Sequence, residues 1–273
     1  MSEIFEKFSL KGKTALVTGG AGLLGREFCL TLAQAGAVVY AADLDATAAK
    51  AVAEELHSKG YLAHSIRLDV TDPTSVNSAI DAIVENTGRL DILVNSAAMD
   101  PKFDPEHAQS NSNAFETYPL QSWQDAVNVN LTGPFLVSQG AARQMVKQGK
   151  GSIINICSTY GLGGPDQRIY EKPGQPKVYK PVYYTVTKAG ILGLTKYLAT
   201  YYAGTEIRVN ALTPGGVYNN HDEEFTRNYS TRTVIGRMAH KDEMNGALLF
   251  LASDASSYMT GGNVIVDGGW TAW

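Results

Sequence analysis

Hydrophobic residues in this chain form short continuous runs, separated by longer segments in which they recur at helical spacing. The runs predict buried strands, and the segments between them predict amphipathic helices. Strands are predicted at 13–18, 37–42, 63–68, 90–94, 151–157, 207–211 and 264–266, and helices at 26–35, 46–59, 73–87, 121–148, around 184–188 and at 241–252. This alternation is typical of βαβ units. Residues 1–273 therefore predict one doubly wound α/β domain, in which helices cover both faces of a parallel sheet.

Three polar segments interrupt the alternation. Residues 99–119 contain three prolines and several Asn and Ser, and predict a surface loop or lid. Residues 165–181 contain four prolines, which exclude a regular element there. Residues 219–233 form another polar patch. Loops on a rigid scaffold often carry binding specificity, so these segments are candidates for substrate contacts.

A glycine-rich turn follows the first predicted strand. Residues 19–25 read Gly-Gly-Ala-Gly-Leu-Leu-Gly and lead into the first predicted helix. Glycines let the backbone approach a pyrophosphate, and the helix N-terminus offers unpaired N–H groups. An ordinary strand-to-helix turn is the alternative, but strand, glycine turn and helix in this order favour a dinucleotide cofactor.

An aspartate at the carboxyl end of the second strand indicates which cofactor is preferred. Asp43 is followed by Leu44, and no basic side chain occurs within the glycine turn. A carboxylate at this position accepts the ribose hydroxyls and repels a 2′-phosphate. We therefore expect NAD rather than NADP, with a solvated aspartate at a strand end as the alternative.

Composition and charge exclude several other classes of protein. A net charge of −4 argues against a nucleic-acid surface, and no apolar run approaches the length that a membrane span requires. The amino terminus has no signal-peptide pattern, so we expect a cytoplasmic protein. Cys29 and Cys157 lie in apolar segments, where buried reduced thiols are expected. The five histidines are scattered, and no metal site is expected.

The stretch 182–190 carries the candidate chemistry. Tyr184 and Lys188 are four residues apart, which places them one turn apart on one helix face. A nearby ammonium favours the phenolate and lowers the pKa of a tyrosine, as proton transfer at neutral pH requires. Alone, this spacing more often means a ring packed under a lysine stem. Only Tyr184 has the spacing, so Tyr183 is expected to pack in the core or contact substrate.

Taken together, the motifs resemble those of the short-chain dehydrogenase/reductase family over nearly the whole chain, from about residue 10 to the end. The resemblance implies a single Rossmann-like domain, a nicotinamide cofactor and the interconversion of an alcohol and a ketone. The matching positions are the turn at 18–25, Asp69 and Val70, residues 95–98, Asn130, Ser158, Tyr184 with Lys188, Pro214 and Gly215, and residues 266–269.

By position, the resemblance implies a catalytic tetrad. Tyr184 would be the general acid/base, Lys188 would lower its pKa and bind the nicotinamide ribose, Ser158 would hold the substrate oxygen, and Asn130 would position a water. The implied cofactor-binding residues are Gly19, Gly22, Leu23, Leu24, Gly25, Asp43, Asp69, Val70, Asn95, Ala97, Tyr184, Lys188, Pro214, Gly215 and Val217.

Two positions depart from the usual pattern of small members of the family. Leu23 stands where they usually have glycine, and the spacing of Gly19, Gly22 and Gly25 instead matches extended members, many of them sugar-nucleotide epimerases and dehydratases. The usual threonine after Pro214 and Gly215 is missing, and Asn219 or Asn220 is a candidate to replace it.

The insertion at 165–181 points to the substrate. It lengthens the segment between Ser158 and Tyr184 and carries four basic and two acidic residues, with tyrosines between them. We expect a polar, sugar-like and anionic substrate (a sugar phosphate, sugar acid or nucleotide sugar), although a solvated loop or a subunit contact would also fit. The candidate substrate residues are Ser158, Tyr160, Arg168, Lys172 and Tyr184.

A closer resemblance supports the sugar hypothesis. Residues 158–171, 213–217 and 267–273 are similar to those of a bacterial subgroup associated with flagellin modification and surface-glycan sugar biosynthesis. Gluconate and other polyol dehydrogenases are the nearest competitors. A sugar epimerase or dehydratase that recycles bound NAD, and a non-catalytic NAD-binding protein, are the alternatives from other classes.

The family resemblance also implies an assembly. It indicates a homotetramer, or less often a homodimer, built on the long helices that contain Asn130 and Tyr184. Trp270 and Trp273 near the carboxyl terminus would either cover a partner subunit or pack on their own chain.

Overall fold

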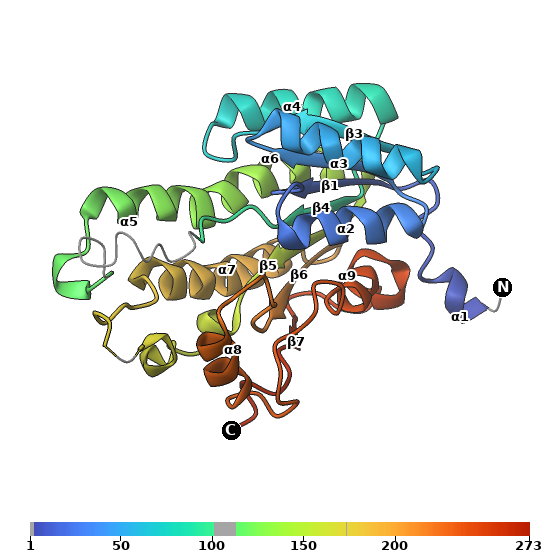
Figure 1. The fold of residues 1–273 in the computed structure, drawn as a ribbon. Coiled ribbons are helices and arrows are strands. Elements are labelled where there is room, and N and C mark those ends of the chain that lie inside the picture. The colour runs from blue at the N-terminus through green and yellow to red at the C-terminus, as the bar shows by residue number, and fades with distance from the viewer. Residues whose placement is uncertain (1–2, 101–112, 173) are drawn as a thin grey trace.

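The computed structural model describes residues 3–100, 113–172 and 174–273, and these form one α/β domain (Figure 1). Its strands are β1 Thr14–Thr18, β2 Val38–Asp43, β3 Ala63–Arg67, β4 Ile92–Asn95, β5 Lys150–Ile156, β6 Glu206–Pro214 and β7 Asn263–Val266. They form a single sheet in the order β3-β2-β1-β4-β5-β6-β7, and every pair is parallel. The predicted doubly wound, Rossmann-like fold is confirmed.

Helices cover both faces of this sheet. They are α1 Glu3–Glu6, α2 Leu23–Gln34, α3 Ala46–Ser58, α4 Pro73–Thr87, α5 Leu120–Val127, α6 Gly133–Gln148, α7 Val182–Tyr201, α8 Glu223–Ser230 and α9 Asn245–Ala252. Apolar residues of α2, α3 and α9 share one core cluster, which contains Phe28, Val52 and Leu248. Those of α4, α6 and α7 share a second cluster, which contains Ile80 and Met145. The inner strands β1, β2, β4, β5 and β6 therefore bury both of their faces, as continuous apolar runs predict, whereas the edge strands β3 and β7 are partly exposed.

The strand and helix predictions from apolar periodicity are confirmed to within a few residues at most ends. Pro73 begins α4 as predicted, because proline at the first helical position loses no hydrogen bond. Asp72 accepts the N–H of Thr74, and Gly88 ends the helix in the left-handed conformation. Local sequence signals therefore mark both ends of this helix, while its apolar face packs in the second core cluster.

Two predictions were incomplete. The long helix expected at 121–148 is interrupted by a π-helical turn at Asn128–Thr132 between α5 and α6, and π-turns often occur at functional sites. The polar patch at 219–233 contains α8, whose N-terminus is capped by Asp222. With few apolar residues, α8 lacked the periodicity by which the other helices were predicted.

The interrupting segments are only partly described. The segment 99–119 contains a 3₁₀ turn at Phe115–Thr117, and its residues 101–112 lie outside the described part. The insertion contains a 3₁₀ turn at Gln167–Tyr170, against the expectation of no regular element. No helix in the described ranges is long and apolar enough to cross a membrane.

Candidate active site

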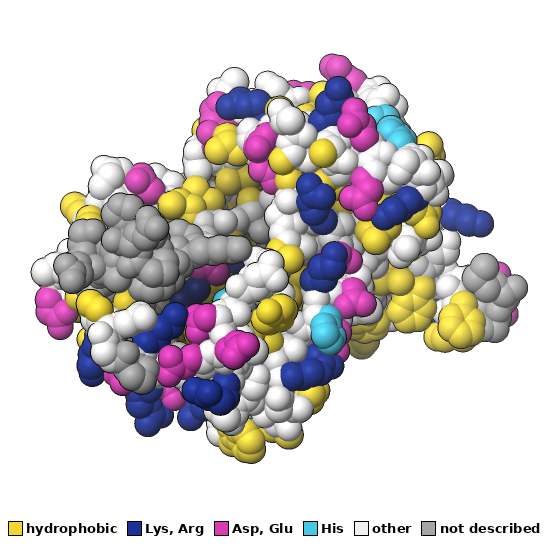
Figure 2. Space-filling view, viewed as in Figure 1, with side chains coloured by type: hydrophobic (Ala, Val, Ile, Leu, Met, Phe, Trp, Pro, Cys, Tyr) yellow, Lys and Arg dark blue, Asp and Glu magenta, His cyan; other side chains and the backbone are white. Residues whose placement is uncertain are grey.

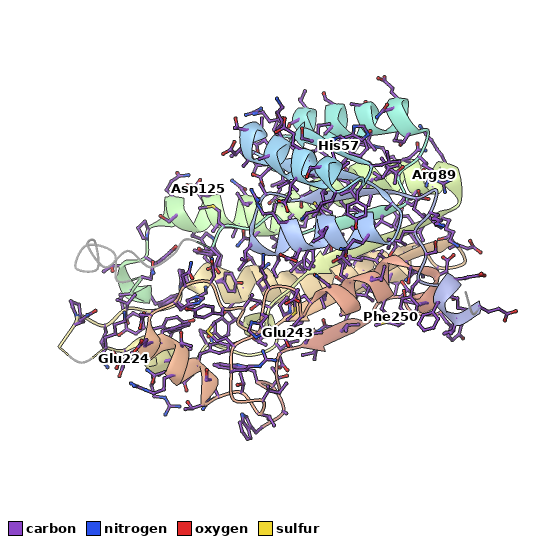
Figure 3. The ribbon with its side chains drawn as sticks, turned by 45° about the vertical axis from the view of Figure 1, so that its right-hand side comes forward. His57, Arg89, Asp125, Glu224, Glu243 and Phe250 are labelled. Atoms are coloured by element: carbon purple, nitrogen blue, oxygen red, sulfur yellow. The ribbon has the colours of Figure 1, made fainter. Side chains whose placement is uncertain are left out.

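The candidate residues gather where the strands end. Because all seven strands run the same way, their carboxyl ends share one edge of the sheet, and the register places Thr18 beside Asn95 and Asn95 beside Asn155. In Figure 3, Arg89 just before β4 and Glu224 on α8 lie at opposite ends of the molecule, so α8 covers the edge where the strands finish. Ligands of open α/β sheets bind at this edge.

The glycine turn connects β1 directly to α2. Gly19 has a φ of +63°, and a Cβ there would lie 2.8 Å from the Cα of Ala97. A Cβ on Gly25 would lie 2.0 Å from the carbonyl oxygen of Gly19. Both positions therefore require glycine. Leu23, which replaces the expected glycine, is the first residue of α2 and lies partly exposed, so the turn accommodates it.

The N-terminus of α2 is free of side-chain caps. Gly22 occupies the N-cap position and supplies no side-chain hydrogen bond to the N–H groups of the first turn, which contains Leu23 and Leu24. Uncapped N–H groups at a helix N-terminus attract phosphate oxygens. This feature, together with the glycines, fits the pyrophosphate of a dinucleotide.

Asp43 ends β2 beside this turn. One carboxylate oxygen accepts the N–H of Ala21 at 3.1 Å, and the other accepts the N–H of Asp45 at 3.2 Å. Each carboxylate oxygen can accept more than one hydrogen bond, so Asp43 keeps acceptor capacity for the hydroxyls of a ribose. The position is the one expected of a residue that binds adenosine ribose.

The next candidates follow β3 and β4. Asp69 accepts the N–H and hydroxyl of Thr71, which lowers the pKa of its carboxyl, and Val70 packs under Gly133. The hydroxyl oxygen of Thr18 accepts the N–H groups of Ser96 and Ala97, each at 3.1 Å. These bonds hold the segment after β4 against the glycine turn, so Ala97 borders the same space.

Buried amides connect β4 to its neighbours. The amide nitrogen of Asn95 donates to Ser138 and to Asn155, and Asn155 in turn donates to Thr195. Among the described residues, the side-chain oxygen of Asn95 has no hydrogen-bond partner although it is buried. Asn95 therefore positions the strand ends, and its oxygen remains free to accept a bond among the described residues.

The π-helical turn positions Asn130 at the same edge. Its side-chain oxygen accepts the N–H of Met99 at 2.6 Å, and its amide donates to the carbonyl of Met99 at 3.1 Å. Asn130 is buried and so clamps the chain directly after β4. The sequence predicted the residue but not the π-turn that orients it.

Tyr184, Lys188 and Ser158 come together as predicted. The hydroxyl of Tyr184 lies close enough to Ser158, which follows β5, for the serine side chain to lower the pKa of the phenol. The ammonium nitrogen of Lys188 lies 5.8 Å from the ring centroid of Tyr184 and donates to the carbonyl of Ile156 at 2.9 Å. Tyr183 is buried, and its ring lies 6.2 Å from that of Tyr118 in a tilted arrangement, which supports a packing role. The three catalytic candidates thus share one site.

The expected lowering of the Tyr184 pKa does not occur in this arrangement. Burial raises the pKa of Tyr184 and the carboxylate of Asp100 raises it further, whereas the hydrogen bond from Ser158 lowers it. Burial also lowers the pKa of Lys188. Burial is the largest influence on the pKa of Tyr184, so this residue carries its proton at neutral pH and is prepared to act as an acid.

An aromatic cluster borders the tyrosine. The ring of Tyr160 lies edge-on to those of Tyr184 and Trp270, and its hydroxyl lies 3.0 Å from that of Tyr170 in the insertion. Trp270 stacks on Tyr229 of α8 with ring centroids 4.3 Å apart. Trp270 therefore packs on its own chain, while Trp273 remains exposed. Tyr160, a predicted substrate residue, lies beside the reacting group.

The two basic residues expected to bind substrate are already paired with carboxylates. Arg168 forms a bidentate ion pair with Asp166 and its side chain is 77% exposed, and Lys172 binds Asp222 at 2.9 Å. The cation that reaches Tyr184 is Lys180, with its ammonium nitrogen 4.0 Å from the ring centroid. In the sequence, Lys180 is only one of the four basic residues of the insertion. Its position four residues before Tyr184 was the sequence signal that could have indicated this contact.

The segment after β6 also lies at the edge of the sheet where the strands end. A Cβ on Gly215 would lie 2.7 Å from the Cα of Asp267, so Pro214 and Gly215 pass close to the end of β7. Val217 pairs with Ala239 in an isolated bridge, and Asn220 has a φ of +53°. Asn219 and Asn220 are the two candidates to replace the missing threonine. The backbone N–H of Asn219 donates to the imidazole Nδ1 of His221. No group of His, Cys, Asp or Glu with the makings of a metal site occurs in the described ranges.

Comparison with known proteins decides the family. A family model described as enoyl-(acyl carrier protein) reductase, of the short-chain alcohol dehydrogenase type, matches residues 20–271. The chain belongs to the short-chain dehydrogenase/reductase family. It is therefore an oxidoreductase that acts on CH–OH groups with an NAD(P) cofactor.

Relatives within this family differ in substrate. The chain is 35% identical to a 3-oxoacyl-[acyl-carrier-protein] reductase of Aquifex aeolicus, over 96% of this chain and 99% of the relative. It is 34% identical to a D-threitol dehydrogenase of Mycolicibacterium smegmatis, over 97% of this chain and 95% of the relative. A gluconate 5-dehydrogenase of Burkholderia cenocepacia, solved with NADP and tartrate, matches with a TM-score of 0.83, 31% identity and 98% coverage of both chains.

Proposed function

We propose that this short-chain dehydrogenase/reductase interconverts a secondary alcohol and a ketone on a polar, sugar-like substrate and prefers NAD. The observation that carries the proposal is the grouping of Tyr184, Ser158 and Lys188 at the edge of the sheet beside an uncapped helix N-terminus. The proton-transfer group and the expected cofactor cradle thus share one edge.

The bound nicotinamide would supply or accept the hydride. Tyr184 would give a proton to the substrate oxygen during reduction and take it back during oxidation. Ser158, whose side chain lies near the Tyr184 hydroxyl, would donate to the same oxygen as negative charge develops on it. Two donors converging on that oxygen stabilise the transition state more than the ground state.

Lys188 and Asn130 would support this transfer. The ammonium of Lys188 is buried and held by the carbonyl of Ile156, from where it would bind the ribose hydroxyls. Asn130 is fixed by Met99 and would hold a water on the proton path. Backbone groups hold both side chains, so their positions do not depend on the rotamers of other side chains.

The preference for NAD follows from Asp43. Its carboxylate lies beside the glycine turn, where it would accept ribose hydroxyls and repel a 2′-phosphate. The related gluconate 5-dehydrogenase was solved with NADP, so the proposed preference rests on Asp43 of this chain and not on its relatives. Direct comparison of the two cofactors tests it.

The nature of the insertion supports a sugar-like substrate. The hydroxyl groups of Tyr160 and Tyr170 and the ammonium group of Lys180 lie on the substrate side of Tyr184 in this proposal. Figure 2 shows charged side chains of both signs around the insertion and α8, at the lower left. Relatives that act on threitol and gluconate agree with this class. A role in flagellin-modification or surface-glycan sugar biosynthesis rests on the resemblance of residues 158–171, 213–217 and 267–273 alone.

The alternatives have less support. The comparisons reported above match oxidoreductases over almost the whole chain. Apart from the spacing of Gly19, Gly22 and Gly25, no feature of the described residues favours an epimerase or dehydratase that recycles NAD. The similarity to 3-oxoacyl-[acyl-carrier-protein] reductases keeps an acyl substrate as a specific competitor. The family resemblance also keeps a homotetramer or homodimer as the expected assembly.

The test is a measurement of nicotinamide absorbance with purified protein. NAD(H) and NADP(H) are each combined with sugar acids, alditols, sugar phosphates, nucleotide sugars and a 3-oxoacyl thioester. We expect a change in absorbance with NAD(H) and one of the sugar-like compounds. Turnover of the thioester alone would replace the proposal with a fatty-acyl reductase, and product formed without a net absorbance change would replace it with an epimerase.

A further inference from the structure

Lys180 occupies an unusual position for a residue of a surface insertion. Its ammonium nitrogen lies 4.0 Å from the ring centroid of Tyr184, and its side chain is only 15% exposed. A cation at this distance from an aromatic face interacts favourably with the ring. The insertion therefore delivers a positive charge to the residue that exchanges the proton.

The backbone of Lys180 is fixed. The side chain of Gln167, in the 3₁₀ turn of the insertion, accepts the N–H of Lys180 at 2.9 Å and donates to its carbonyl at 3.4 Å. Pro181 follows and precedes the first residue of α7. The backbone of Lys180 is thus held from both sides, and the contacts of its ammonium with Tyr184 and Asp100 set the direction of the side chain.

The carboxylate that pairs with Lys180 is far more accessible than Lys180 itself. Asp100 binds the ammonium at 2.5 Å, and its side chain is 45% exposed. If another anion replaced it, Asp100 could turn to water at little cost, whereas the ammonium of Lys180, on a side chain that is only 15% exposed, would still need a negative partner. The pair is therefore suited to exchange one carboxylate for another.

We propose that Lys180 is the residue that binds an anionic group of the substrate, a carboxylate next to the polyol chain, by exchange with Asp100. This rests on the proposed function and narrows it from sugar-like compounds in general to sugar acids. Arg168 and Lys172, the cations first expected in this role, stay with Asp166 and Asp222.

Binding of two matched probes tests the proposal separately from catalysis. D-gluconate and D-glucitol have the same number of carbons, and the carboxylate of the first is a hydroxymethyl group in the second. Calorimetric titration of the protein with saturating NADH gives the ratio of the two dissociation constants. We expect wild type to bind gluconate at least tenfold more tightly, as a charged hydrogen bond implies.

Two substitutions locate the effect. Lys180→Met keeps the stem over Tyr184 and removes the charge, and we expect the preference for gluconate to be lost. Asp100→Asn removes the competing carboxylate and is expected to strengthen gluconate binding several-fold. Lys177→Met is the matched control, because Lys177 belongs to the same insertion but pairs with Glu171 and is 67% exposed.

The outcomes separate this inference from the proposed function. Equal binding of both probes by wild type, or an equal effect of Lys177→Met and Lys180→Met, would overturn the role of Lys180 even if the dehydrogenase activity is found. Binding of gluconate that depends on Lys180, without any oxidation of a sugar acid, would support the anion site and count against the proposed reaction.

Discussion

The glycine turn at 19–25 and the insertion at 165–181 serve the same edge of the sheet, but they are held in place by different interactions. The turn is fixed by backbone contacts so close that Gly19 and Gly25 have no room for a side chain. The insertion is fixed by side chains: Lys172 reaches Asp222, and Tyr170 packs on Phe225 of α8. Gly163 and Gly164, just before it, have open space.

This difference corresponds to two kinds of ligand. A cofactor shared by a whole family can be bound by backbone N–H groups, which do not change when side chains are substituted. A substrate that differs between relatives is better recognised by replaceable side chains on a segment docked to a rigid sheet. Substitutions in the two regions should therefore fail in different ways.

The largest loss of activity is expected from a substitution of Tyr184, the proposed proton-transfer residue, which belongs to neither of the two regions. Tyr184→Phe removes the hydroxyl that would exchange the proton, and turnover should fall about 10³-fold while the protein still folds. Tyr183→Phe is the matched control: its buried hydroxyl has no hydrogen-bond partner among the described residues, so turnover should persist. Steady-state kinetics of both variants is the measurement, and a Tyr184→Phe variant as active as the parent would exclude the mechanism.

The pH dependence follows from the burial of Tyr184. Because burial raises the pKa of this phenol, the proton acceptor needed for oxidation is scarce at neutral pH and becomes more abundant as pH rises. Alcohol oxidation should therefore accelerate from pH 7 to 9 without reaching a plateau, whereas ketone reduction should not. A plateau of oxidation near pH 7 would mean that the bound cofactor lowers the pKa of Tyr184 after all.

The next largest effect, on stability and cofactor binding, is expected from a substitution in the glycine turn. Gly25→Ala would force a Cβ against the carbonyl oxygen of Gly19, and overpacking of this kind costs on the order of 3 kcal/mol. Gly246→Ala in α9 is the control, because a Cβ there has open space. Thermal unfolding and NADH titration of both variants check this. A Gly25→Ala protein with normal stability and cofactor binding would show that the turn can move.

These two regions also explain what the sequence could predict. The strands, most helices and the glycine turn follow from local patterns, so their positions emerged within a few residues. The ion pairs of the insertion join residues far apart in sequence, such as Lys180 and Asp100, and no local pattern reveals such pairing. Counting charges identified a basic insertion but could not show that Lys180, and not Arg168 or Lys172, lies against the ring of Tyr184. Similarly, α8 was missed because capping by Asp222 and packing on the insertion, rather than apolar periodicity, stabilise it.

A smaller effect is expected at the cofactor-selecting residue. Asp43→Asn keeps acceptor capacity for a ribose but removes the charge that repels a 2′-phosphate, so the preference for NAD over NADP should fall roughly tenfold. Asp45→Asn is the control, since Asp45 caps α3 and asparagine caps equally well. Dissociation constants of both cofactors for each variant provide the test. An unchanged ratio for Asp43→Asn would mean that another group selects the cofactor.

The smallest effect is expected for the ion pair that docks the insertion on α8. Lys172 and Asp222 are both partly exposed, so their coupling energy should be about 0.5–1 kcal/mol in a double-mutant cycle of Lys172→Met and Asp222→Asn. Asp222 also caps α8, and asparagine preserves that cap, so the cycle isolates the pair. Unfolding free energies and substrate KM are measured together. If docking shapes the substrate side, KM should rise while cofactor affinity stays constant; a change in both would mean that the two regions are not independent.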